Sequence, residues 1–361
     1  MERRLASKIA GRGAQSSAVP DRFGLAAREL DGDWRDHMEA LDGPPPPLRT
    51  HVTEEKPRSI LSFNQSPDIG FDRSINAYRG CEHGCVYCFA RPTHAYHDLS
   101  PGLDFETHLF AKPDAAQLLR ETLAKPRYRP KPIAMGTNTD PYQPIERRYR
   151  ITRQVLEVCL DARHPVTITT KSDRVLADLD LIAEMAARSL VAVAISVTSL
   201  DPKLSGKLEP RASSPAKRLA ALGKLAEAGI PTHCSVAPVI PAITDEFMEE
   251  IVERAAALGV ASAGWIPLRL PHEVAPLFRE WLSVHYPERA GKVMSIVRSI
   301  RAGKDNDPDF FTRLRPTGVW ADLFRTRFRL ACKRARLGKA KFELDCTQFR
   351  PPEMGGQMRL L

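Results

Sequence analysis

The sequence has no uninterrupted apolar run long enough to cross a membrane, although 43% of its 361 residues are hydrophobic. Its first residues, Met1 to Gln15, are charged and contain no apolar stretch of the secretory kind. A repeat of the solenoid type is also missing. We therefore expect a cytoplasmic protein that has no membrane partner.

Cysteines are few, and their spacing does not fit a disulfide framework. There are seven, an odd number, and four of them stand alone: Cys159, Cys234, Cys332 and Cys346. In a chain without an export signal, clustered cysteines are more often metal ligands or catalytic groups than disulfides. The three that cluster are therefore the first candidates for a functional site.

Acidic residues are too few to balance the basic ones. The chain has 53 Lys and Arg against 44 Asp and Glu, which gives a formal net charge of +9. This excess suits an anionic partner such as nucleic acid, although many basic proteins have none. Between Trp320 and Lys341 the basic residues alternate with Phe324 and Phe328, with Phe342 just beyond. Two interpretations stay open: contact with phosphates and bases, or an amphipathic helix whose Phe residues point inward.

From Ser59 onward, short β-branched runs alternate with helical patterns. Strands are expected at 74–78, 133–136, 166–170, 190–197, 232–239 and 262–268, and helices at 150–162, 176–188, 215–228, 245–258 and 273–286. Strand followed by helix, repeated about six times, predicts an α/β fold with a parallel sheet and crossover helices. Six units do not complete an eight-fold barrel, so we expect a partial (β/α)6 barrel with its chemistry at the carboxyl ends of the strands.

The ends of the chain differ in composition from its middle. Residues 1–58 mix charge with Gly and Ser and end in the prolines 44–47, which predicts a largely disordered, flexible N-terminal extension. Residues 59–300 are expected to form the core domain. Residues 301–361 form a basic C-terminal extension, because most of the excess positive charge lies there.

The clustered cysteines occupy the segment Cys81-Glu82-His83-Gly84-Cys85-Val86-Tyr87-Cys88. Soft thiolates select iron–sulfur clusters, zinc or copper(I). Spacings of three and two residues allow one tight loop to wrap one metal centre. Glycines at positions 80 and 84 permit the backbone conformations that such wrapping needs.

The number of cysteines separates the candidate metal centres. A structural zinc site requires four ligands; His83 is the nearest fourth, but no second cysteine pair with finger spacing follows. An electron-transfer [4Fe–4S] cluster also requires four cysteines. Three cysteines leave one iron open, and an open coordination position implies chemistry at that position. A non-catalytic zinc or iron–sulfur protein is the alternative.

The spacing C-x3-C-x2-C, with Tyr87 before the last cysteine, resembles the signature of the radical S-adenosylmethionine (SAM) superfamily. Residues 77–91, 139–144 and 209–211 resemble the group related to spore photoproduct lyase, also known as DNA repair photolyases, and the similarity runs from about residue 59 to 270. This resemblance implies that Cys81, Cys85 and Cys88 bind a [4Fe–4S] cluster whose fourth iron is chelated by SAM. It also implies a one-electron reductant such as flavodoxin or ferredoxin.

The same resemblance implies polar contacts to SAM after the second to fifth strands. We expect Thr139 and Asp140 near its amino group, Lys171 or Arg211 near its carboxylate, and Ser196 near its ribose. Each has a structural alternative: a turn cap for Asp140, a surface position for Lys171 and Arg211, and a hydrogen bond to the backbone for Ser196.

The resemblance implies reductive cleavage of SAM to a 5′-deoxyadenosyl radical, which abstracts hydrogen from a substrate. In spore photoproduct lyase that substrate is a thymine dimer in DNA, so nucleic acid is the leading substrate class. A protein or small-molecule substrate is the alternative within the superfamily. Cys234 is the isolated cysteine expected nearest the barrel interior. The resemblance implies a cysteine that returns a hydrogen atom to the substrate, and the alternative is that Cys234 is simply a small buried hydrophobic residue. We assign no catalytic residue and no oligomeric state from the sequence.

Overall fold

The computed structural model describes residues 9, 11–17, 48–338 and 342–353. Most of the N-terminal extension predicted at 1–58 lies outside these residues, so its disorder and its boundary stay predictions. The described part of that extension makes specific contacts, which are taken up below. No helix in the described part of the chain has both the length and the apolar composition to cross a membrane.

A seven-stranded sheet with the order β10-β9-β8-β7-β6-β3-β2 forms the centre of the fold. Its members are β2 (Leu61–Phe63), β3 (Arg73–Ile75), β6 (Ile133–Met135), β7 (Val166–Thr170), β8 (Val191–Ser196), β9 (Thr232–Val239) and β10 (Ser262–Pro267). Neighbours from β3 to β10 are parallel, and only β2 at the edge is antiparallel. The edge strands β2 and β10 do not pair within the described residues. The expected open arrangement of six parallel strands is confirmed.

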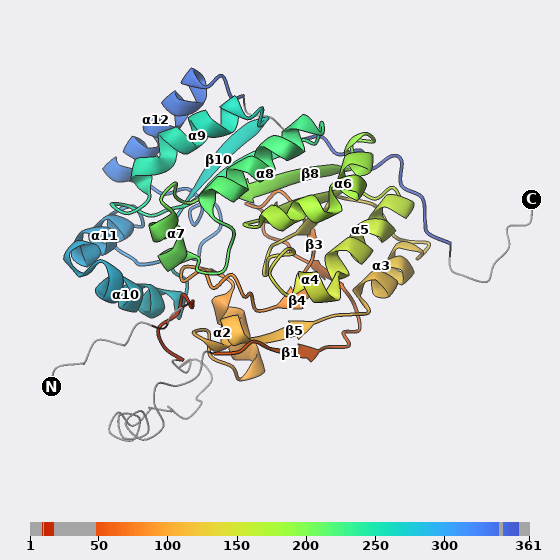
Figure 1. The fold of residues 1–361 in the computed structure, drawn as a ribbon, viewed down its shortest axis with the longest axis horizontal. Helices are drawn as coiled ribbons and strands as arrows, with labels where there is room; N and C mark the ends of the chain where they lie inside the picture. Colours follow the sequence, from red (N-terminus) through yellow and green to blue (C-terminus); the bar gives the residue numbers. More distant parts are fainter. Residues whose placement is uncertain (1–8, 10, 18–47, 339–341, 354–361) are drawn as a thin grey trace, which may run out of the picture.

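The helices alternate with these strands as expected. After β6 come α4 (Glu146–Tyr149) and α5 (Ile151–Asp161), after β7 α6 (Leu179–Ala186), after β8 α7 (Pro202–Leu208) and α8 (Pro215–Glu227), after β9 α9 (Met248–Ala257), and after β10 α10 (Val274–His285) and α11 (Pro287–Ser299). Short 3₁₀ helices at Asp173–Asp178 and Asp245–Phe247 precede α6 and α9. Figure 1 shows α5, α6, α8 and α9 in front of the sheet.

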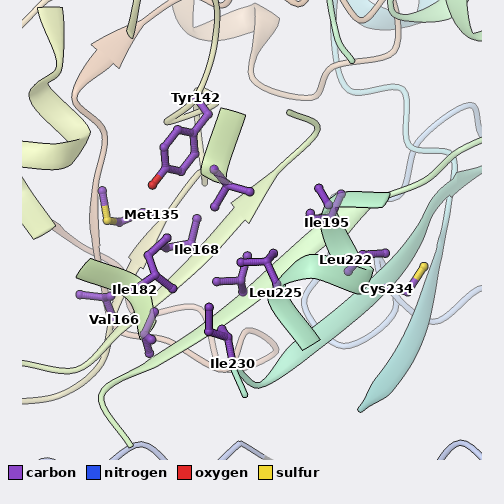
Figure 2. Packing of buried hydrophobic residues seen from close by; sticks show 14 of the residues in the cluster. Met135, Tyr142, Val166, Ile168, Ile182, Ile195, Leu222, Leu225, Ile230 and Cys234 are labelled. Carbon is purple, nitrogen blue, oxygen red and sulfur yellow. The ribbon is translucent and has the colours of Figure 1, made fainter. Parts of the chain in front are cut away.

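The apolar residues whose spacing predicted these helices are the residues that the helices bury. In α5, for example, Ile151, Val155, Leu156 and Cys159 are all buried. Figure 2 shows how such residues meet the strands: Ile182, Leu222 and Leu225 from the helices lie beside Ile168 and Ile195 from the sheet. Full burial of each such side chain contributes about 1.5–3 kcal/mol to the stability of the core.

A second, three-stranded sheet was not expected from the sequence. It has the order β1-β5-β4 and consists of β1 (His51–Glu54), β5 (His108–Ala111) and β4 (Tyr78–Arg79). The strand expected at 74–78 is therefore two strands, β3 in the large sheet and β4 in the small one. Between the sheets Asn76 turns inward, where its Oδ1 accepts a hydrogen bond from the Asn138 amide at 2.9 Å. The helices of this region are a 3₁₀ helix at Arg91–His97, α2 (Asp104–Thr107) and α3 (Ala115–Leu123).

The basic C-terminal segment contains α12 (Val319–Arg334), which lies beside α9 in Figure 1. Phe324 is 1% exposed and its ring lies 6.3 Å from that of Trp265, while Phe328 packs against the core. Arg327 pairs with both Glu249 and Asp245. Phe324 and Phe328 therefore point inward, as the amphipathic interpretation expects, and are not free to stack on bases.

Candidate active site

The cysteine loop begins directly after β4 and is closed by its own backbone. The Gly84 amide donates to the Cys81 carbonyl at 3.3 Å, and the Cys88 amide donates to the Cys85 carbonyl at 3.1 Å. Gly80 opens the loop with a φ of 73°, and a Cβ there would lie 2.6 Å from the Leu109 side chain. Only glycine satisfies both the left-handed conformation and the close packing at this position.

All three cysteines of the loop line one cavity at the carboxyl ends of the parallel strands. The other walls come from the segment after β6, the end of β7 and the end of β8. The lining residues are Cys81, His83, Cys85, Cys88, Phe89, Ala90, Gly136, Thr137, Asn138, Thr139, Asp140, Thr169, Thr170, Lys171 and Ser196. Four of the five residues that we expected near SAM, namely Thr139, Asp140, Lys171 and Ser196, thus share a cavity with the cysteines.

The chemistry of the three thiols fits an iron–sulfur cluster. Cys81 and Cys85 are 7% and 8% exposed, and burial together with the nearby carboxylates Asp140 and Glu209 raises the pKa of both thiols. Buried thiolates therefore require a strong positive charge beside them, which iron supplies.

The arrangement of possible ligands also favours a cluster over a single ion. No three His, Cys, Asp or Glu side chains of the described residues converge as the ligands of one metal ion would. In a cluster each thiolate binds a different iron, so the sulfurs lie farther apart than they do around zinc. The structural zinc alternative receives no support from this geometry.

Asp140 ties three walls of the cavity together. Its Oδ1 accepts hydrogen bonds from the Thr170 hydroxyl at 2.6 Å and the Tyr142 amide at 2.9 Å. Its Oδ2 accepts from the Lys171 amide at 2.8 Å and lies 3.3 Å from Nδ1 of His83. Burial would raise the pKa of Asp140, but the His83 ring and these donors lower it to about 2. Asp140 therefore fixes the cysteine loop against the ends of β6 and β7.

Thr139 and Gly136 are held as firmly as Asp140. The Thr139 hydroxyl donates to the Gly80 carbonyl at 2.7 Å and accepts from the Gln143 amide group at 2.9 Å. Gly136 has a φ of 89°, and a Cβ there would lie 2.0 Å from the Thr169 carbonyl oxygen. The segment after β6 thus approaches β7 more closely than any side chain would permit.

The structure does not bring Arg211 to the cavity, contrary to our expectation. Its Nη2 lies 3.0 Å from Oε1 of Glu82, and its side chain is 36% exposed. The segment between α7 and α8 turns Glu209, not Arg211, toward the interior. Arg211 is thus not among the residues that line this cavity, and its contact with SAM stays a prediction.

Glu209 and Arg218 form a fully buried ion pair behind the cavity that sequence reasoning missed. Arg218 also donates to the carbonyls of Ser213 at 2.6 Å and Ser196 at 3.1 Å. Glu209 accepts from the Tyr87 hydroxyl and from Thr198. Burial would raise the pKa of Glu209, but Arg218 and Lys171 lower it to about 2. The available signal was the position of Arg218 within the apolar stripe of α8.

Cys234 does not line the cavity. It is 0% exposed on β9 and packs within the apolar core shown in Figure 2. Burial raises the pKa of its thiol to about 12, so it stays protonated. This position fits the small-hydrophobe alternative for Cys234.

Comparison with known families and proteins agrees with this site. A family model described as the radical SAM superfamily matches residues 75–255. An uncharacterised protein of Mycobacterium tuberculosis is 38% identical over 242 residues, which cover 66% of this chain and 71% of that protein. An uncharacterised protein of Methanocaldococcus jannaschii is 29% identical over 215 residues, covering 59% of this chain and 76% of the relative.

Among solved structures, spore photoproduct lyase shares the fold. A complex of that enzyme with a dinucleoside spore photoproduct has a TM-score of 0.52 and 16% sequence identity, covering 78% of this chain and 79% of the lyase. A variant of the same enzyme with bound AdoMet and the same photoproduct has a TM-score of 0.50 over the same shares.

Proposed function

The chain belongs to the radical SAM superfamily, and from this premise we propose that it is an enzyme acting on nucleic acid, with repair of a DNA lesion by lyase-type chemistry as the specific form. Enzymes of the superfamily use a [4Fe–4S] cluster and SAM. When bound, these cofactors supply a 5′-deoxyadenosyl radical that removes a hydrogen atom from the substrate. The protein contributes binding, orientation and the exclusion of side reactions.

The observation that carries the proposal is the single cavity shared by the three cysteines and the polar ends of β6, β7 and β8. Cys81, Cys85 and Cys88 would hold the cluster. Lys171 would meet the SAM carboxylate as a point charge, because it lines the cavity and lies 5.9 Å from the Tyr87 ring.

The other polar residues have more local roles in this proposal. Ser196, at the end of β8, faces the cavity where a ribose hydroxyl would bind. Thr139 and Asp140 would act mainly as positioning residues, since their oxygens already accept or donate hydrogen bonds within the protein. The wall at Phe89, which is 53% exposed, would face the substrate.

Two observations support nucleic acid as the substrate class. The fold is that of spore photoproduct lyase, which was solved with a dinucleoside photoproduct. The net charge of +9 suits a polyanion. The electron donor we propose is a flavodoxin or ferredoxin, and the cytoplasmic location stays a prediction from the sequence.

Replacement of Lys171 by methionine tests the assignment of the SAM carboxylate. The variant keeps a similar volume but loses the positive charge, and a charge-assisted hydrogen bond contributes about 1.5–3 kcal/mol. We expect the affinity for SAM to fall by about 10- to 100-fold. Anaerobic calorimetry on the reconstituted protein would measure it, with the exposed Lys217→Met on α8 as the matched control. An unchanged dissociation constant would remove Lys171 from the site.

The substrate class is tested by comparing DNA substrates under anaerobic conditions. The reduced, reconstituted protein receives SAM together with ultraviolet-irradiated DNA, the same DNA without irradiation, or no DNA. We expect irradiated DNA alone to accelerate 5′-deoxyadenosine formation and to lose thymine lesions, as measured by mass spectrometry. Binding should also weaken steeply as salt rises. Equal 5′-deoxyadenosine formation in all three reactions, with salt-independent or absent DNA binding, would favour a protein or small-molecule substrate instead.

A further inference from the structure

A short N-terminal segment, residues 11–16, packs against the cysteine loop. Arg12, Gly13, Ala14 and Gln15 are buried, whereas the sequence predicted disorder for this region. In Figure 1 the segment appears in red beside α2 and α10. Its far end is fixed by Ser16, whose hydroxyl donates to Glu280 of α10 at 2.9 Å and whose carbonyl accepts from the Leu103 amide at 3.1 Å. We call residues 11–16 the N-terminal strap.

The carboxylate of Glu106, at 0% exposure, joins the strap to the cysteine loop. Its Oε2 accepts from the Gly13 amide at 3.0 Å, and its Oε1 accepts from the Ala14 amide at 2.8 Å and from Arg91 at 2.5 Å. Arg91 in turn donates to the carbonyls of Cys85 at 2.9 Å and Gly84 at 3.2 Å. A continuous chain of hydrogen bonds therefore runs from the strap to the backbone of a cluster-binding cysteine.

Direct packing reinforces this connection. A Cβ on Gly13 would lie only 1.7 Å from the Gly84 carbonyl oxygen and 3.2 Å from the Val86 amide nitrogen. Gly84 itself has a φ of 66°, and a Cβ there would lie 2.7 Å from Oε2 of Glu106. Strap and loop thus meet backbone against backbone, and neither surface has room for a methyl group.

We propose that the N-terminal strap is a fixed part of the cluster-binding scaffold, and that Gly13 and Glu106 are positioning residues that hold the loop from Cys81 to Cys88 in its cluster-binding conformation. The strap approaches the loop at Gly84 and Val86, between the cysteines, and leaves the cavity open for SAM. This inference rests on the superfamily's cluster and not on the proposed nucleic-acid substrate, so each can fail without the other.

The test measures iron release from the full-length, reconstituted protein to an excess of chelator under anaerobic conditions. In Gly13→Ala, the added methyl group must displace either strap or loop, and overpacking of this kind costs enough to change an equilibrium or rate by about tenfold or more. We expect iron to be released at least about tenfold faster than from the wild type. The matched control is Gly291→Ala in α11, where a Cβ meets nothing within 4 Å.

Glu106→Gln provides a second variant that adds no non-hydrogen atoms to the interface. All three groups that face the carboxylate are donors, so the glutamine must turn its own NH2 donor toward one of them. The substitution also leaves the buried Arg91 without its counter-charge, so the thermal unfolding midpoint of the cluster-free chain should fall. We expect iron release that is faster than this fall in stability accounts for. Wild-type iron release from both variants would overturn the proposal. So would a fall in the midpoint of the cluster-free chain that accounts for the whole effect, because the role would then be purely structural.

Discussion

Replacement of Cys85 by alanine is expected to reduce 5′-deoxyadenosine formation to background, a loss of about three orders of magnitude or ~4 kcal/mol of transition-state stabilisation. Cys85 is buried, and no other cysteine of the described chain lines the cavity except Cys81 and Cys88. Two thiolates cannot complete a three-cysteine centre, so the cluster should be lost or unstable. The measurement is anaerobic reconstitution, iron and sulfide analysis, and quantification of product after addition of dithionite and SAM.

Cys346→Ala is the matched control for this variant. Cys346 is partly exposed and does not line the cavity, so the same substitution there should leave both iron content and product formation unchanged. Full activity of Cys85→Ala would contradict the assignment of the loop as the cluster site. A wild-type protein that takes up zinc in place of iron and does not bind SAM would contradict it more deeply.

The strands that carry the cavity were predictable because short β-branched runs alternate with helical patterns along the sequence. The bounds expected for β7 and β9 are those of the structure, and the strands in register with them end at the same edge. Asp140, Lys171 and Ser196 were grouped because the superfamily resemblance implies polar contacts after these strands, and the shared edge brings them into one cavity. Their positions follow from the parallel pairing of buried strands, whose register is set by the hydrophobic pattern.

The small sheet and the strap could not be predicted by the same means. β4 has two residues and β1 only four, which is too short for periodicity to be visible. The strap is stabilised by hydrogen bonds to Glu106, which is more than ninety residues away in the sequence. From the sequence alone, a glycine in such a segment indicates a flexible backbone. In the structure, Gly13 instead allows two backbones to approach each other closely.

The segment around Arg211 shows a further limit of sequence reasoning. Glu209 and Arg211, separated by Pro210, both offered side chains that could reach the cavity, and charge complementarity with a carboxylate favoured the arginine. The choice is made by the turn after α7, which buries Glu209 and leaves Arg211 to pair with Glu82. Backbone direction in a turn of this kind depends on tertiary contacts, here the hydrogen bond from the Arg211 amide to the His83 carbonyl at 3.2 Å.

Replacement of Arg218 by methionine is expected to destabilise the protein by about 3–5 kcal/mol, the usual cost of leaving one member of a buried ion pair uncompensated. Both side chains of the Arg218–Glu209 pair are 1% exposed. The substitution also removes the donors that satisfy the carbonyls of Ser213 and Ser196. The measurement is the urea midpoint of the cluster-free chain, which should fall markedly without a change in the denaturant slope.

Arg254→Met is the matched control, since Arg254 forms an exposed pair with Glu250 one helical turn away in α9. Such a pair contributes less than about 1 kcal/mol, so the same loss of charge should scarcely move the midpoint. The double variant Arg218→Met with Glu209→Gln should recover part of the lost stability, because no unpaired charge then remains buried. If Arg218→Met and Arg254→Met shifted the midpoint equally, Glu209 would have to be accessible to water. The region behind Tyr87 and Ser196 would then admit water, contrary to the full burial of the Glu209–Arg218 pair in the structure.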